Sequence, residues 1–206
     1  MIIGMTHPRL LSRSLPLYNR QDMHMKSTMI VARFAALAVA LVAAAGAPAL
    51  AQESPAARTS VTIAGKTLAI RYAAPSVRKR KIFGPGGLLS MDPTYPAWRA
   101  GANAATAFHT DADLDIGGLS VPKGDYTIYC WVADPENWQL IISKETGQWG
   151  LTYHPKLDLG RVKMTMSKPP ALIETYKMTL SAGAGNAGKL ELAWENHVAS
   201  VPITVK

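Results

Sequence analysis

The sequence predicts an all-β domain, either an antiparallel two-sheet sandwich or a jelly-roll-like fold of about nine or ten strands. Three observations support this prediction. Polar and apolar residues alternate along most of the chain after residue 52, turn residues separate the alternating stretches, and no segment carries apolar residues at a sustained helical spacing.

Alternation is clearest in four stretches, each of which is expected to form a strand with one buried and one solvated face. These stretches are 66–72, 161–166, 174–180 and 189–195, and a last strand is expected at 198–205. Glycine, proline, asparagine and aspartate between the strands predict turns. The predicted turns are Ala64-Gly65, Gly117-Gly118, 122–125, 134–137, 183–188 and Asn196-His197.

Two stretches depart from plain alternation. Tyr126–Val132 is apolar or aromatic on nearly both faces, which predicts a central strand that is covered on both sides. The segment from Ala73 to Asn103 carries four prolines and no regular pattern. Unpatterned connections longer than about 15 residues are usually functional in compact domains. We therefore expect this long loop to cover one sheet and to form the wall of any cleft.

Residues 1–51 are predicted to be an N-terminal extension followed by a secretory signal peptide. Lys26 and Arg33 precede an alanine-rich apolar run that ends Ala49-Leu50-Ala51, which places cleavage before Gln52. The true start of translation is expected at Met23 or Met25. No Arg-Arg pair precedes the run and no cysteine follows it, so the general secretory route without a lipid or membrane anchor is expected. The mature protein would then be periplasmic or secreted.

The mature part, residues 52–206, is long enough for a single β-sandwich domain with a sizeable core. Removing residues 1–51 takes away five basic side chains and one acidic side chain, so the formal net charge falls from +8 to +4. That mild excess does not favour a nucleic-acid partner. With Cys130 as the only cysteine, the fold must be held by its core and not by an internal disulfide.

Several groups of residues resemble, in the same order, the bacterial exported domain-of-unknown-function family twenty-nine eleven. They are 80–84, Trp98–Thr106, Val121–Ile128, Gln148-Trp149-Gly150 with Tyr153, Asp158, and Arg161-Val162. The resemblance covers residues 58–206, and the Trp-Arg-x-Gly-Ala-Asn block beginning at Trp98 is its most specific part. It implies a small all-β exported bacterial domain and carries over no activity.

The Trp98–Thr106 block joins the long loop to a strand and holds the first ligand-binding candidates: Trp98, Arg99, Asn103 and Thr106. Arg99 offers a planar fork of donors suited to carboxylate, phosphate or sulfate, and Asn103 both donates and accepts. The structural alternative is that Arg99 pairs with a buried carboxylate such as Asp158 while Asn103 caps a turn. Both interpretations remain open from the sequence.

Three further candidates come from other segments. Lys81 ends the basic run 78–81 beside Ile82-Phe83, so it could grip an anion or simply belong to a solvated loop. Trp149, with Tyr153 nearby, could stack on a sugar or act as a hydrophobic plug.

The three mature histidines, His109, His154 and His197, are widely spaced and form no His-x-His or His-Glu-x-x-His pattern. A zinc or copper site built from them is therefore a minority interpretation, and the sequence predicts no metal and no cofactor. No Gly-x-Ser-x-Gly elbow is present, and Cys130 lies in an apolar strand where a thiolate is disfavoured.

Three classes of function remain. The favoured hypothesis is a non-catalytic envelope or secreted binding module for a small anionic or sugar-like ligand. The first alternative is a hydrolase, metal-dependent or metal-free, in which His109 or His154 works with an acid such as Asp158. The second alternative is a purely structural envelope protein, which predicts that Arg99 and Asn103 are internally paired. The sequence leaves the oligomeric state open.

Overall fold

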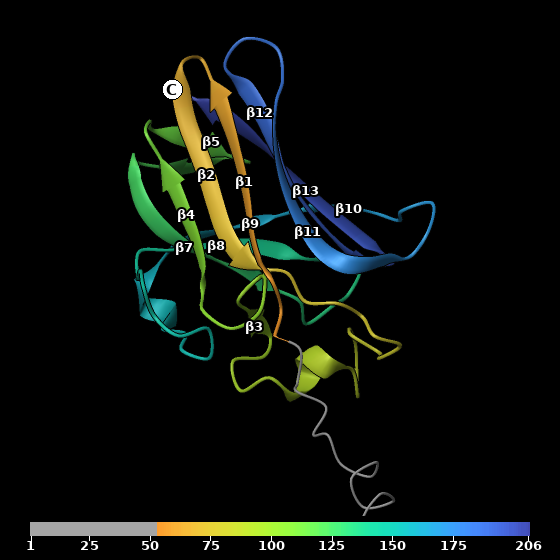
Figure 1. Cartoon of the computed structure of the whole chain (residues 1–206). Helices are drawn as coiled ribbons and strands as arrows, with labels where there is room; N and C mark the ends of the chain where they lie inside the picture. Colours follow the sequence, from red (N-terminus) through yellow and green to blue (C-terminus); the bar gives the residue numbers. More distant parts are fainter. Residues whose placement is uncertain (1–52) are drawn as a thin grey trace, which may run out of the picture. The chain divides into compact units, whose positions relative to one another are not determined.

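The computed structural model describes residues 53–206, so the predicted extension and signal peptide lie outside the described residues. Within this range the chain forms thirteen strands, two short 3₁₀ turns and no α-helix, in two antiparallel sheets (Figure 1). The all-β two-sheet prediction is confirmed. The strands beyond the predicted nine or ten are short segments of two or three residues. In this part of the chain, no helix has the length and apolar character needed to span a bilayer.

The larger sheet, called the β7 sheet after its central strand, has the order β1-β2-β4-β7-β8-β9, and β3 also pairs with β7. Its strands are β1 (Ala56–Ile63), β2 (Lys66–Ala73), β3 (Ala97–Trp98), β4 (Thr106–Thr110), β7 (Gly124–Trp131), β8 (Gln139–Ser143) and β9 (Asp158–Lys163).

The second sheet, called the β12 sheet, has the order β11-β12-β13-β5-β6, and β10 also pairs with β13. Its strands are β5 (Leu114–Ile116), β6 (Leu119–Val121), β10 (Thr165–Ser167), β11 (Ile173–Ala182), β12 (Ala187–Glu195) and β13 (His197–Val205).

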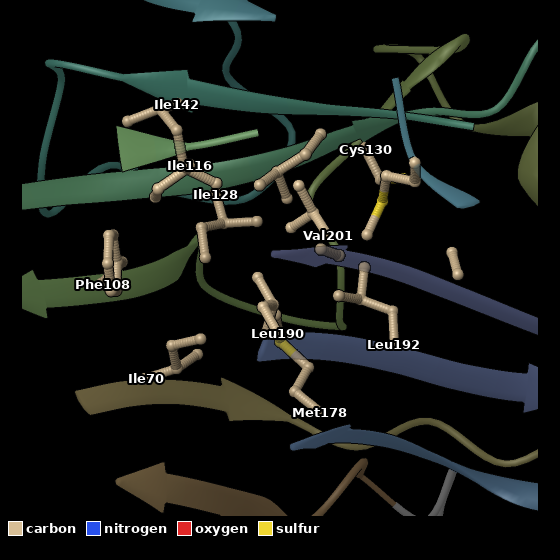
Figure 2. Packing of buried hydrophobic residues seen from close by; sticks show 14 of the residues in the cluster. Ile70, Phe108, Ile116, Ile128, Cys130, Ile142, Met178, Leu190, Leu192 and Val201 are labelled. Atoms are coloured by element: carbon tan, nitrogen blue, oxygen red, sulfur yellow. The ribbon is translucent and has the colours of Figure 1, made fainter. Parts of the chain in front are cut away.

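The main core lies between the two sheets. Strand alternation sends every second side chain inward, so Ile70, Phe108 and Ile128 of the β7 sheet face Leu190 and Val201 of the β12 sheet (Figure 2). At one side of the sandwich, side chains of the β7 sheet hydrogen-bond to β11, the edge strand of the β12 sheet. Tyr72 Oη and Thr59 Oγ1 accept hydrogen bonds from the β11 backbone amides of Met178 and Leu180 at 2.9 and 3.1 Å.

Two predicted hairpin turns are found as expected. Ala64 and Gly65 join β1 to β2 with φ of 49° and 76°, and Gly117 and Gly118 join β5 to β6 with φ of 54° and 93°. Positive φ at both central residues is the geometry that matches the twist of the flanking strands. The β1–β2 register that follows, with Ala56 opposite Ala73 and Ile63 opposite Lys66, positions the groove described below.

The long loop between β2 and β4 covers one end of the core and not the outer face of a sheet. It lies at the lower end of the domain in Figure 1, opposite the C-terminus, and includes the 3₁₀ turn η1 (Leu88–Met91). Its apolar residues Ile82, Phe83 and Leu89 are buried in the main core, where Phe83 lies 4.9 Å from the Trp138 ring. The apolar side chains of this loop therefore seal the open end of the sandwich.

Strand β7 is central and covered on both faces, as predicted, but a different segment covers its outer face. The connection between β8 and β9, residues 144–157, includes the 3₁₀ turn η2 (Pro155–Leu157). It places Tyr153 on Tyr129, with ring centroids 4.8 Å apart. Tyr129, Ala97 and Ile141 form a second, smaller buried cluster there. The expected position of the long loop over this face is therefore corrected.

Candidate functional site

A groove of about 930 Å³ lies on the outer face of β1, β2, β4 and β7. Alternation turns Ala69 and Arg71 of β2 outward, together with Ala107 of β4 and Thr127 of β7. The connection 144–157 covers the other half of this sheet face, from β7 to β9. The groove is the half that remains uncovered.

Two arginines stand at the β1–β2 side of the groove. Arg58 and Arg71 are directly opposite each other in the β1–β2 register, and both side chains are exposed. Within residues 53–206 neither guanidinium has an ion pair or hydrogen bond with another side chain. Directly opposite like charges are unfavourable in a sheet, so this pair does not serve the stability of the fold.

The floor of the groove consists of small side chains. Seven of its twenty lining residues are alanines, including Ala69 and Ala107 on neighbouring strands and the opposed pair Ala56 and Ala73. Alanine is depleted in strands because it gives little to cross-strand packing. Here the short side chains lower the sheet surface below the surrounding residues, and this creates the hollow.

The wall opposite the arginines is formed by backbone pairing of two loops. The amide of Ala105 donates to the carbonyl of Gln148 at 3.3 Å, and the amide of Gly150 donates to the carbonyl of Asn103 at 3.2 Å. Asn103 adopts a left-handed φ of 61°, a conformation that asparagine tolerates well. A side chain at position 150 would meet the Arg99 side chain and the Asn103 carbonyl, so glycine is required there.

His109 and Asp125 occupy the end of the groove. His109 Nδ1 lies 2.8 Å from Asp125 Oδ1, and Nε2 lies 3.0 Å from Asp111 Oδ1. The hydrogen bond with Asp111, followed by that with Asp125, raises the pKa of His109, and His109 in turn lowers the pKa of Asp111. Two carboxylates at the two ring nitrogens favour the imidazolium, in which both nitrogens donate.

The predicted Trp98–Thr106 block serves mainly the structure around the groove. Trp98 is 2 % exposed, and its indole N–H donates to the Gly101 carbonyl at 2.9 Å. Thr106 is also buried and donates to the Ala100 carbonyl. Arg99 forms an ion pair of 2.8 Å with Asp92, where Asp158 had been the expected partner. The Trp98 and Arg99 side chains line a smaller hollow of about 230 Å³, while Asn103 lines the groove.

The other predicted ligand-binding residues are dispersed. Lys81 donates to the Pro85 carbonyl at 2.6 Å on the exposed long loop and does not line the groove. Tyr153 packs on Tyr129 and donates to Asp158 at 2.7 Å. Burial, followed by the Asp158 carboxylate, raises the pKa of Tyr153. Trp149 is 58 % exposed and pairs through its backbone with Ala104, a groove residue.

The three histidines lie at separate places. His109 is at the groove, His154 lies 2.9 Å from Glu145, and His197 stacks on Trp138 near Glu195. Among residues 53–206 no three His, Cys, Asp or Glu side chains form a group that could hold a metal ion. Cys130 is buried in β7, and this burial raises the pKa of its thiol.

Comparison with known proteins gives a family for this chain. Residues 54–203 match the family described as "Protein of unknown function (DUF2911)". The chain belongs to this family. It is the same family that the Trp98–Thr106 block indicated from the sequence. No curated protein and no solved structure matches the chain.

The DUF2911 match includes every residue that lines the groove. Sequence analysis identified the wall residue Asn103 and missed the two arginines, although a signal for them existed. Arg58 lies six residues before Ala64, and Arg71 lies six residues after Gly65. A two-residue hairpin turn places such residues opposite each other, so the predicted turn implied the arginine pair.

Proposed function

We propose that this DUF2911 protein is an exported, non-catalytic binding module that holds an anionic ligand in the groove on its β7 sheet. The observation that carries the proposal is the opposed pair Arg58 and Arg71. Both guanidinium groups are exposed at a groove of about 930 Å³ and have no acidic partner within residues 53–206. An anion from solution would supply the missing counter-charge.

The chemistry of the pair suits a carboxylate, phosphate or sulfate group. Guanidinium is planar and always charged, and it presents donors in a fork that matches two oxygens of an oxyanion. Side chains directly opposite on neighbouring strands start about 5 Å apart, which is close enough for both forks to reach one anionic group. Binding would relieve the repulsion between the two arginines, so the site is prepared for a negative charge.

The geometry of His109 supports binding in preference to hydrolysis. A general base needs a free ring nitrogen within hydrogen-bond reach of its substrate. Both nitrogens of His109 are held by carboxylates, at 2.8 and 3.0 Å, so neither faces a substrate in the groove. His154, the other candidate base, pairs with Glu145 on the connection 144–157 and does not line the groove.

The test is a calorimetric titration of the purified protein with acetate, phosphate and sulfate, compared with the same titration of Arg58→Gln and Arg71→Gln. Each variant should bind the preferred anion about tenfold or more weakly, the worth of a charged hydrogen bond. Lys177→Gln, on the exposed face of the β12 sheet, removes the same charge elsewhere and should bind normally. Equal affinity in all four proteins would overturn the proposal.

Export is supported by the sequence pattern before residue 52. The proposal predicts that the general secretory pathway delivers a chain that begins at Gln52 to the periplasm or the medium. Intact-mass spectrometry of cell fractions, after expression of the full chain in a bacterium with an envelope, measures this directly. A full-length chain retained in the cytoplasm would contradict it.

A further inference from the structure

We infer that the ligand of this groove is an organic anion with an apolar body, such as a fatty or aromatic carboxylate or an organophosphate. The anionic group would lie on Arg58 and Arg71, and the apolar body would lie on the alanine floor. This inference rests on the proposed function and narrows it, because it excludes both inorganic anions and polar sugars as the natural ligand.

The size of the groove argues against an inorganic ion. Grooves of about 300–1,000 Å³ hold whole organic molecules, and this one has a volume of about 930 Å³. The arginine pair lies at one side of it, on the edge strand β1 and its neighbour β2. A single phosphate or sulfate at that pair would leave the rest of the hollow filled with water.

The chemistry of the floor argues against a sugar. A bound sugar needs hydrogen-bond partners for its hydroxyl groups, since polar groups that lose water without replacement carry a penalty. Ala107 of β4 lies opposite Arg71 on one side and Thr127 of β7 on the other, so a methyl group separates the arginines from β7. Ala69, two residues before Arg71 on β2, adds a second methyl group to the floor. Thr127 already donates its hydroxyl to the Glu145 carbonyl at 2.7 Å. Methyl groups favour contact with a hydrocarbon or aromatic surface.

Trp149 is not part of this groove. Its neighbour Gln148 lines the groove and donates to Thr127 at 3.2 Å, and alternation along an extended segment directs the next side chain to the opposite side. The 58 % exposed indole of Trp149 therefore lies outside the groove, and the apolar body is assigned to the alanine floor alone.

The experiment titrates the purified protein with octanoate, inorganic phosphate and octyl glucoside, the last below its micelle concentration, and measures the heat of binding by calorimetry. Octanoate has both the anion and the apolar body, whereas each of the other probes has only one. The inference predicts that octanoate binds at least about tenfold more tightly than either probe. Relative to phosphate, two buried methylene groups suffice for that factor. Relative to octyl glucoside, a hydrogen bond to the charged carboxylate suffices.

A variant that fills the groove distinguishes binding of the apolar body from binding of the anionic group. Ala69→Leu adds bulk to the floor on the outer face of β2, opposite His109 and not opposite an arginine. It should weaken octanoate binding about tenfold while phosphate binding at the arginines stays unchanged. Ala182→Leu, at an exposed position of β11, is the matched control and should bind both probes normally.

The outcomes distinguish this inference from the proposed function. Equal affinity for octanoate and phosphate, lost together in Arg71→Gln, overturns the apolar body and leaves the anion site standing. Equal affinity for octanoate and octyl glucoside, unaffected by Arg71→Gln, overturns the anion site and with it the inference. No binding of any probe overturns both.

Discussion

Replacing one of the opposed arginines should stabilise the fold while it weakens binding. In Arg71→Gln the repulsion between residues 58 and 71 is removed. Opposite like charges on neighbouring strands cost about 0.2–1 kcal/mol, and the loss of packing is small because both side chains are exposed. For a domain of this size, 1 kcal/mol corresponds to about 2–4 °C in Tm. The variant should therefore unfold up to about 4 °C higher than the natural protein.

Thermal unfolding followed by circular dichroism at low ionic strength measures this effect. Added salt screens exposed charges, with a Debye length of about 10 Å at 0.1 M. Sodium chloride should therefore raise the Tm of the natural protein and close its gap to Arg71→Gln. The double variant with Arg58→Gln should gain little further, because the repulsion has already gone.

The opposite sign would refute this reasoning. If Arg71→Gln lowers the Tm and the losses of the two single variants add up in the double variant, each arginine makes its own stabilising contact. The pair would then be a feature of the fold and not a site that awaits an anion. Lys177→Gln shows how far a general change in net charge moves the Tm.

Three further predictions concern residues that the sequence singled out. Trp98→Ala should lower the free energy of unfolding by about 3–5 kcal/mol in urea, because a large buried side chain is removed. The stabilisation from protonated His109 should be complete below about pH 6.5 and lost as the pH rises through its raised pKa. The Tm should therefore fall more steeply above pH 6.5 in the natural protein than in His109→Gln. Cys130 should react with a thiol reagent only when the protein unfolds, because burial raises the pKa of its thiol.

Each of these has a clear contrary result. Unchanged stability in Trp98→Ala would show that burial of this indole does not stabilise the fold. Parallel pH profiles for the natural protein and His109→Gln, or a histidine proton resonance that titrates at or below pH 6.5, would show that the two carboxylates do not hold the imidazolium. Rapid labelling of native Cys130 would mean that β7 is accessible to solvent.

The sequence predicted those strands that are long enough to show an alternation of polar and apolar residues. Alternation over seven or more residues identified the strands that became β2, β11 and β12. Strands β3, β5, β6 and β10 have two or three residues, too few to show any alternation. The segment covering β7 was misassigned because alternation predicts that a face is covered but does not say by what. That choice depends on where Tyr153 and Phe83 pack in three dimensions.

The candidate site was harder to predict, because the chemical type of a side chain did not show whether it lies at the groove. Arg99 drew attention through its neighbours in the sequence, yet its charge is matched by Asp92, seven residues earlier. Arg58 and Arg71 stand in ordinary alternating strands, and only their pairing makes them unusual. The pairing of Arg58 with Arg71 follows from the register of β1 and β2, and the predicted Ala64-Gly65 turn determines that register.

Loss of binding alone would not identify a ligand contact in this protein, because Arg99 supports the wall of the groove from behind. Its side chain lies against Gly150, whose amide bonds to Asn103, and its carboxylate partner is nearly buried. Arg99→Ala should therefore weaken binding by loosening the wall, and it should lower the Tm because Asp92 loses its partner. Arg71→Gln should weaken binding and raise the Tm. The sign of the stability change separates the residue that shapes the groove from the residue that contacts the anion.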